Sequence, residues 1–129
     1  MAKYLIIGGG IVGLAVAREL KTQNSLSEII IIDKESNVAY HGSGRNSGVL
    51  HAGFYYTANS LKAKLTKDGN SLMKKYCHEN NLAIRESQKV VVAKNEYDLS
   101  YLYKLEKRGI ENGVDVKLVD EKELNDIEP

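Results

Sequence analysis

The chain has 129 residues, of which 27% are charged and 43% hydrophobic, and its formal net charge at pH 7 is +1. This balance is typical of a soluble globular protein and gives no charge excess that would point to nucleic acid as a partner. No apolar run approaches the roughly 18 residues that a membrane-spanning helix needs. The single cysteine, Cys77, excludes an internal disulfide and any metal site built on several cysteines, and we predict no metal.

The N-terminal segment predicts a strand, a glycine-rich turn, a helix and a second strand. An apolar run over residues 4–7 precedes the turn, and a helical stretch covers residues 11–20. Four consecutive isoleucines at 29–32 form a β-branched run typical of a strand that is buried on both faces of a parallel sheet. We therefore predict an α/β fold with a Rossmann-like βαβ unit, which binds the ADP half of a dinucleotide.

Three glycines have separate roles in this unit. Gly8 permits the tight turn, Gly10 lacks a Cβ that would keep a pyrophosphate from the backbone, and Gly13 lets the helix pack closely on the sheet. The helix N-terminus offers N–H groups to the phosphates, and Asp33 is placed to accept hydrogen bonds from the ribose hydroxyls. An ordinary α/β turn and a secretory signal peptide are the alternatives, and an acid at position 33, twenty residues after Gly13, disfavours both. We expect a retained N-terminus and a cytoplasmic protein.

Residues 35–56 follow neither the helical nor the strand period. The segment is rich in glycine, serine and asparagine, yet it also contains aromatic residues that disordered linkers usually lack, so we predict an ordered ligand-binding loop. In NAD-binding domains a helix and a third strand follow the acid, whereas a long loop suits the larger FAD. Lys34 raises NADP as an alternative, but Asp33 would repel its 2′-phosphate. Arg45 is either a partner for a phosphate or carboxylate or a surface charge. The predicted FAD contacts are Gly8, Gly10, Ile11, Val12, Gly13, Asp33, Lys34, Gly44, Arg45, Asn46, Ser47 and Gly48.

Further elements are predicted along the rest of the chain. A helix over 59–80, capped by Asn59 or Ser60, has Leu61, Leu65, Leu72, Met73 and Tyr76 on one face. Strands are predicted at 88–94 and 114–119, with a helix over 96–112 between them and another helix starting at Asp120. Residues 1–80, with the cofactor loop at 35–58, are assigned to the N-terminal part of an FAD-binding domain, and 81–129 to the start of an α+β substrate domain. A complete doubly wound domain needs two such halves, so we expect a fragment of a larger enzyme.

A longer motif lies in the loop and the following helix. Residues 44–57, Gly-Arg-Asn-Ser-Gly-Val-Leu-His-Ala-Gly-Phe-Tyr-Tyr-Thr, and residues 60–64, Ser-Leu-Lys-Ala-Lys, resemble the L-2-hydroxyglutarate oxidase/dehydrogenase group. This group lies within the D-amino-acid-oxidase/glycerol-3-phosphate-dehydrogenase superfamily of FAD-dependent oxidoreductases. The resemblance implies a glutathione-reductase-like FAD domain and oxidation of L-2-hydroxyglutarate to 2-oxoglutarate. Hydride would pass to flavin N5, and the electrons would pass on to oxygen or a membrane quinone. Asp33 stands where the group more often has glutamate, and either carboxylate can hold the ribose.

His51 is the candidate catalytic base. A neutral histidine with a pKa of about 6.5 is suited to take the hydroxyl proton as the hydride leaves, but a flavin contact or a structural role is an equal alternative. Tyr55, Tyr56 and Arg45 are candidates for contacts to a dicarboxylate or to FAD. Other functions left open are a catalytically incomplete nucleotide-binding fragment and a glycine, sarcosine or glycerol-3-phosphate oxidoreductase. Peripheral attachment to the inner face of the membrane is also left open.

Overall fold

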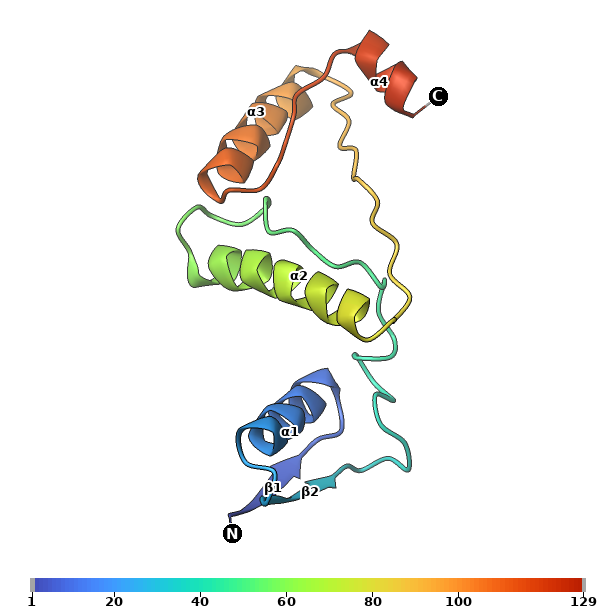
Figure 1. Ribbon diagram of the computed structural model, residues 1–129. Coiled ribbons are helices and arrows are strands. Elements are labelled where there is room, and N and C mark those ends of the chain that lie inside the picture. Colours follow the sequence, from blue (N-terminus) through green and yellow to red (C-terminus); the bar gives the residue numbers. More distant parts are fainter. Residues whose placement is uncertain (1, 129) are drawn as a thin grey trace. The chain divides into compact units, whose positions relative to one another are not determined.

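The computed structural model describes residues 2–128, which form two strands and four helices. The chain divides into two compact units, Met1–Val49 and Leu50–Pro129. The first unit holds both strands and one helix, and the second holds the other three helices (Figure 1). The predicted boundary between a cofactor domain and a substrate domain at residues 80 and 81 concerns a complete enzyme and stays a prediction.

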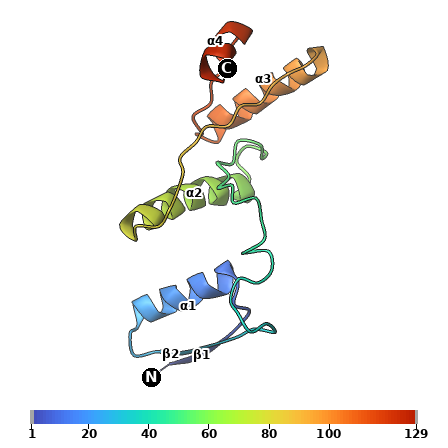
Figure 2. The same cartoon turned by 90° about the vertical axis from the view of Figure 1, so that its right-hand side faces the viewer.

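The first unit is a βαβ motif. Strand β1 (Lys3–Ile7) pairs in parallel with β2 (Glu28–Ile32), in a register that sets Tyr4 opposite Ile29 and Ile7 opposite Ile32. Helix α1 (Ile11–Gln23) connects them and covers one face of the two-stranded sheet (Figures 1 and 2). Parallel strands need such a crossover, because a short turn cannot return the chain to the same end of the sheet. The predicted Rossmann-like unit is confirmed.

The isoleucine run is covered on one face only, which corrects the expectation of burial on both. Ile29 and Ile31 lie on the partly covered face, whereas Ile30 and Ile32 are 51% and 46% exposed. Ile7 of the neighbouring strand is 82% exposed. A sheet face is buried only when another layer packs on it, and α1 supplies one layer. The second apolar face is therefore left open within the part of the chain that the structure describes.

The second unit contains α2 (Leu61–Glu79), α3 (Glu96–Glu111) and α4 (Glu121–Ile127). A polar side chain caps each N-terminus: Ser60 accepts a hydrogen bond from Ala63 N–H, Asn95 from Asp98 N–H, and Asp120 from Glu123 N–H. Gly113 has a φ of +64°, a left-handed conformation that ends α3 one residue past its cap. The predicted helices are thus confirmed to within one or two residues at these ends.

The two strands predicted at 88–94 and 114–119 are wrong. Both segments are irregular, and the only strand pairing among residues 2–128 is that of β1 with β2. Residues 90–93 are Val-Val-Val-Ala, a composition that fits a pleated surface. A strand also needs a hydrogen-bonded neighbour, and no described segment provides one for either sequence.

The apolar face predicted for α2 is not its buried face. Leu61, Leu65 and Leu72 are 71%, 59% and 67% exposed, whereas Ala63 is 2% exposed. The side of α2 that carries Ala63 and Asn70 faces the loop before the helix, because Asn70 donates hydrogen bonds to backbone carbonyls there. Small and amide side chains let irregular backbone approach a helix and find donors, which leucine does not offer.

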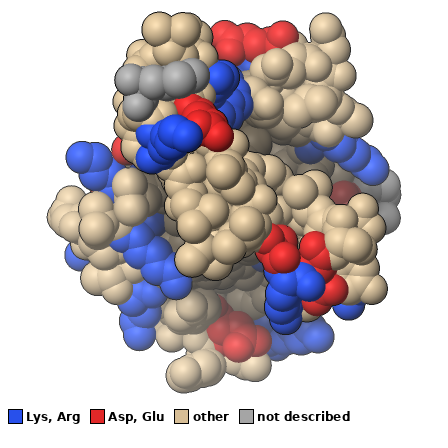
Figure 3. All heavy atoms as spheres, turned by 90° about the horizontal axis from the view of Figure 1, so that it is seen from below, with Lys and Arg blue, Asp and Glu red and all other residues tan. Residues whose placement is uncertain are grey.

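On the face drawn in Figure 3, basic and acidic side chains lie next to one another in several places. Ion pairs of this kind include Lys3 with Glu28, at 2.9 Å between Nζ and Oε2. Such exposed pairs contribute little to stability, about 0–1 kcal/mol each. Within residues 2–128, none of the helices combines the length and the apolar composition needed to cross a bilayer.

Candidate functional site

The turn between β1 and α1 needs glycine at the positions that the fingerprint predicts. Gly8 has a φ of +109°, in the region that favours glycine. A Cβ added to Gly13 would overlap the carbonyl oxygen of Gly8, so only glycine lets the first turn of α1 lie against the end of β1. Gly10 is the N-cap residue of α1 and has no side chain that could accept hydrogen bonds from the first turn, so these N–H groups need acceptors from elsewhere.

Asp33 holds this turn from the end of β2. Its Oδ2 accepts a hydrogen bond of 2.6 Å from Gly9 N–H, and its Oδ1 accepts one of 2.9 Å from Glu35 N–H. Hydrogen bonds from Glu35 N–H and then from Gly9 N–H hold the pKa of the Asp33 carboxyl below its usual value. Both hydrogen bonds are strongest when the Asp33 carboxyl is ionised. The exposed carboxylate has further lone pairs, which can accept hydrogen bonds from hydroxyl groups. Lys34 points to Glu35, with 3.9 Å between Nζ and Oε1.

Ser43 makes a contact at the candidate site that was not predicted from the sequence. Its Oγ accepts a hydrogen bond of 2.9 Å from Ile11 N–H, the first residue of α1, and lies 3.1 Å from the position of an added Cβ at Gly10. A hydroxyl from 32 residues away thus occupies the position next to the open end of the helix. Sequence showed a serine between two glycines, but only the folded loop brings that serine to the helix N-terminus.

Replacing Ser43 by alanine is expected to lower the free energy of unfolding by about 1 kcal/mol, the usual effect of losing a side-chain cap. The reason is that Ile11 N–H loses its acceptor at a position where Gly10 offers none. Urea unfolding followed by circular dichroism measures the change. Ser47→Ala is the matched control, since Ser47 is exposed and makes no side-chain hydrogen bond within residues 2–128. Equal midpoints for Ser43→Ala and wild type would contradict the capping role.

The cofactor loop folds back on the glycine turn through its own first residues. Ala39 N–H donates to the Gly9 carbonyl at 2.9 Å, and a Cβ added at Gly44 would overlap the Ala39 carbonyl oxygen. Asn46 closes the next turn: its Nδ2 donates to two carbonyls at 3.0 Å, and its Oδ1 accepts from Gly48 N–H at 2.7 Å. The structure thereby brings the predicted glycines, Ile11, Asp33 and the start of the loop into one unit.

Other residues predicted to bind FAD or substrate have exposed side chains with few contacts. Arg45 stacks its guanidinium over the Tyr40 ring, 4.5 Å from the ring centroid, and stays exposed. Val12 is 74% exposed. His51 lies in the second unit, where its carbonyl accepts a hydrogen bond from Asn70 Nδ2 at 3.2 Å. This contact does not involve the imidazole ring, and a role of His51 next to a flavin stays a prediction.

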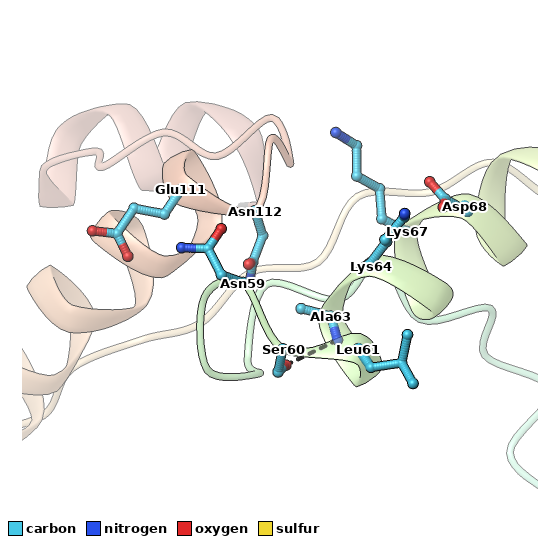
Figure 4. Close-up of a pocket in the computed structure, with 9 residues that line it drawn as sticks. All are labelled: Asn59, Ser60, Leu61, Ala63, Lys64, Lys67, Asp68, Glu111 and Asn112. Carbon is cyan, nitrogen blue, oxygen red and sulfur yellow. Dashed lines mark hydrogen bonds between the residues drawn. The ribbon is translucent and has the colours of Figure 1, made fainter.

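A cavity of about 450 Å³ lies in the second unit, between the N-terminal end of α2 and the C-terminal end of α3 (Figure 4). None of the predicted site residues lines it, and its walls carry both signs of charge. The cavity is therefore a separate feature of this unit and not the predicted cofactor site. Its lining residues are Asn59, Ser60, Leu61, Ala63, Lys64, Lys67, Asp68, Glu111 and Asn112.

Comparison with known proteins agrees with the geometry of the first unit. The model of the FAD-dependent oxidoreductase family DAO matches residues 3–129. The chain is 48% identical over 126 residues to a mitochondrial L-2-hydroxyglutarate dehydrogenase of Dictyostelium discoideum. It is 38% identical over 126 residues to the one of Homo sapiens, and 41% identical over 112 residues to an L-2-hydroxyglutarate dehydrogenase of Indibacter alkaliphilus.

These matches cover most of this chain but only part of each relative. They include 96%, 97% and 87% of the chain and 28%, 27% and 28% of the Dictyostelium, human and Indibacter proteins. The chain thus spans less than a third of the length of the curated relatives it matches. The family match extends across both compact units, from the first strand to the last helix. The chain belongs to the DAO family of FAD-dependent oxidoreductases.

Proposed function

We propose that the protein oxidises L-2-hydroxyglutarate to 2-oxoglutarate with FAD as the cofactor. One observation carries this proposal: relatives named L-2-hydroxyglutarate dehydrogenase are 38–48% identical to the chain over 96–97% of its length. The activity belongs to a complete enzyme, of which this chain supplies the segment described above.

The residues present fit the ADP end of FAD. Gly13 lets the first turn of α1 lie close to the end of β1, and Gly10 offers no side-chain cap, so N–H groups of this turn beyond that of Ile11 would be able to bind a pyrophosphate. The Ser43 hydroxyl is within reach of the same helix end and is able to donate to a phosphate oxygen. Asp33 keeps its ionised carboxylate at the end of β2, where it would accept hydrogen bonds from the ribose hydroxyls.

Residues 45–56 would supply the proposed chemistry on the substrate. FAD would supply the acceptor for the hydride from C2 of the hydroxy acid. His51 would take the hydroxyl proton on an imidazole nitrogen, since its exposed ring has no hydrogen bond to another described side chain. Tyr55, Tyr56 and Arg45 would hold the carboxylates of the substrate; the Arg45 guanidinium is exposed and able to form paired hydrogen bonds.

Anaerobic reduction of the purified flavoprotein tests this proposal. The protein is produced from the complete open reading frame that contains this chain, and its flavin absorbance is recorded before and after each substrate. L-2-Hydroxyglutarate is expected to bleach the flavin at least tenfold faster than the D-enantiomer, glycine, sarcosine or glycerol 3-phosphate. Faster bleaching by an amine or by glycerol 3-phosphate would replace the proposed substrate with that compound and leave the FAD proposal intact.

A catalytically incomplete, FAD-binding or nucleotide-binding segment is the second candidate. The specific observation in its favour is that the chain covers only 27–30% of its relatives. In addition, the second apolar face of the β1–β2 sheet is open within residues 2–128. Residues 1–129 produced alone would then bind FAD weakly or not at all and would not oxidise any of the four substrates. Turnover by these 129 residues alone would reject this candidate.

We propose a cytoplasmic protein that passes its electrons to oxygen or to a membrane quinone. A quinone acceptor would favour peripheral attachment to the inner face of the membrane, whereas several relatives are named mitochondrial. Cell fractionation with a salt wash separates these possibilities, together with assays using oxygen and a soluble quinone. Recovery in the membrane pellet after the salt wash would argue against a cytoplasmic protein.

A further inference from the structure

The loop that carries His51 is held by side chains from two helices. This loop, residues 50–57, is called here the His51 loop; it has no regular secondary structure and connects the cofactor loop to α2. In Figure 1 it runs beside α2 toward the C-terminal end of α3. Few of its carbonyls accept backbone hydrogen bonds: that of Gly53 from Tyr56 N–H at 3.3 Å, and that of Thr57 from Ser60 N–H at 3.2 Å. Side chains outside the loop donate to further carbonyls of the loop.

Asn70, in the middle of α2, supplies the donors at the start of the loop. Its Nδ2 donates to the Leu50 carbonyl at 3.0 Å and to the His51 carbonyl at 3.2 Å. The two carbonyls flank the backbone of His51, so a single amide fixes the path of the chain through this residue. An asparagine amide offers two N–H donors on a short side chain, which a leucine or an aspartate at this position would not.

Asn112, the C-cap residue of α3, supplies the donors at the other end of the loop. Its Nδ2 donates to the Gly53 carbonyl at 3.3 Å and to the Tyr56 carbonyl at 3.1 Å. Arg108, one turn earlier, donates from a guanidinium N–H to the Tyr55 carbonyl at 3.3 Å. Five carbonyls of the His51 loop therefore accept hydrogen bonds from three side chains on α2 and α3.

The His51 loop contacts both helices, whose backbones do not approach each other closely. No Cα atom of α2 lies within 8 Å of a Cα atom of α3, although both belong to the same compact unit. Gly53 is buried with a φ of +98°, and a Cβ there would come within 3.3 Å of the Ala63 carbonyl oxygen on α2. The His51 loop is thus clamped between the helices instead of lying free on their surface.

We propose that Asn70 and Asn112 are positioning residues, which hold His51, Tyr55 and Tyr56 in the geometry needed for turnover. The proposal rests on the proposed function, because it assigns the substrate chemistry to residues of this loop. It adds that α3, which follows the predicted boundary at residue 80, helps to build the site. Neither asparagine touches the substrate; each acts through the backbone of the loop.

Replacing Asn112 by aspartate tests the clamp in the protein produced from the complete open reading frame. The change removes two N–H donors and sets carboxylate oxygens against two carbonyl oxygens, so kcat/KM is expected to fall at least about tenfold. Flavin content is expected to stay within twofold of wild type. Asn125→Asp is the matched control: it makes the same change of charge in the last turns of α4, where the exposed Asn125 has no hydrogen bond to the loop.

A readout independent of catalysis keeps the test separate from the proposed function. Chymotrypsin cleaves after aromatic residues, and the His51 loop contains Phe54, Tyr55 and Tyr56. Asn112→Asp is expected to speed cleavage within the loop about tenfold, as read by mass spectrometry, and Asn125→Asp is expected to leave it unchanged. If wild type shows no flavin reduction, the proposed function fails, while the cleavage rates still decide whether the clamp exists. Unchanged cleavage and unchanged kinetics in Asn112→Asp would overturn the proposal.

Asn70 provides a second variant if Asn112→Asp does not fold. Asn70→Asp removes the donors to the two carbonyls around His51 and is expected to show the same loss of kcat/KM and the same faster cleavage. Asn70→Gln keeps the amide donors on a longer side chain and is expected to recover part of both. A glutamine variant no better than the aspartate variant would show that the amide donors are not what matters, and the proposal would be rejected.

Discussion

Replacing Gly13 by alanine is expected to abolish FAD binding and to lower the free energy of unfolding by at least about 3 kcal/mol, the upper part of the range for overpacking. The added Cβ would overlap the Gly8 carbonyl oxygen, a backbone atom that cannot rotate away as a side chain does. The first turn of α1 would have to move off the end of β1, and its N–H groups would leave the position proposed here for the pyrophosphate. Flavin content of the purified protein and urea unfolding measure the two effects.

Gly69→Ala is the matched control, because it makes the same change in the interior of another helix. A Cβ at Gly69 meets open space, and its backbone is in an ordinary helical conformation, so alanine is expected to stabilise the protein by about 0.5–1 kcal/mol. The same methyl group therefore has opposite effects at the two positions. A Gly13→Ala protein that keeps its flavin and its unfolding midpoint would contradict the packing described for the turn.

The glycine turn of the first unit and the helix starts of the second could be predicted from sequence because each depends on local geometry or on a short-range steric rule. Gly8 and Gly13 are required by a turn whose two sides lie five residues apart. The helix ends at Ser60 and Asp120 followed from side chains that accept hydrogen bonds from N–H groups three residues later. Such contacts are set by helix geometry and need no knowledge of the rest of the fold.

Predictions that depended on a distant surface were less accurate. The isoleucines of β2 and the leucines of α2 are apolar at the expected periods, but burial also needs a second layer. Ile30 and Leu61 are 51% and 71% exposed because no described segment covers them. The valines at 90–92 illustrate the same limit for a strand, since composition describes the side chains and not the presence of a pairing partner.

The candidate site shows most clearly the difference between contacts that are local in sequence and contacts between distant residues. Asp33 was predicted from its position after the isoleucines, and the structure adds that its carboxylate also holds the Gly9 and Glu35 N–H groups. Ser43 and Asn112 were not predicted as site residues, because their contacts span 32 residues and 56–59 residues. A serine in a loop and an asparagine at a helix end each have ordinary local explanations, and only the folded chain shows what they contact.

The Asp33→Asn variant is expected to bind FAD about 10–100-fold more weakly, which corresponds to losing a hydrogen bond to a charged acceptor. An amide has one acceptor oxygen, so it cannot serve both N–H groups of the turn and the ribose hydroxyls as well. Asp33→Glu is the control, because it keeps the carboxylate and is expected to bind within about threefold of wild type. Fluorescence titration with FAD measures both.

The pH dependence of the same variant checks the cause. The folded-state pKa of Asp33 is lowered, first by the hydrogen bond from Glu35 N–H, so its contribution to stability is fully present above the unfolded-state value of about 3.9. That contribution is lost as the pH falls through the lower, folded-state pKa. The difference in unfolding midpoint between wild type and Asp33→Asn should therefore be constant from about pH 5 to pH 8 and should shrink below about pH 4. A difference that instead changes around neutral pH would assign the effect to another group, and the ionised Asp33 carboxylate would then not be what stabilises the turn.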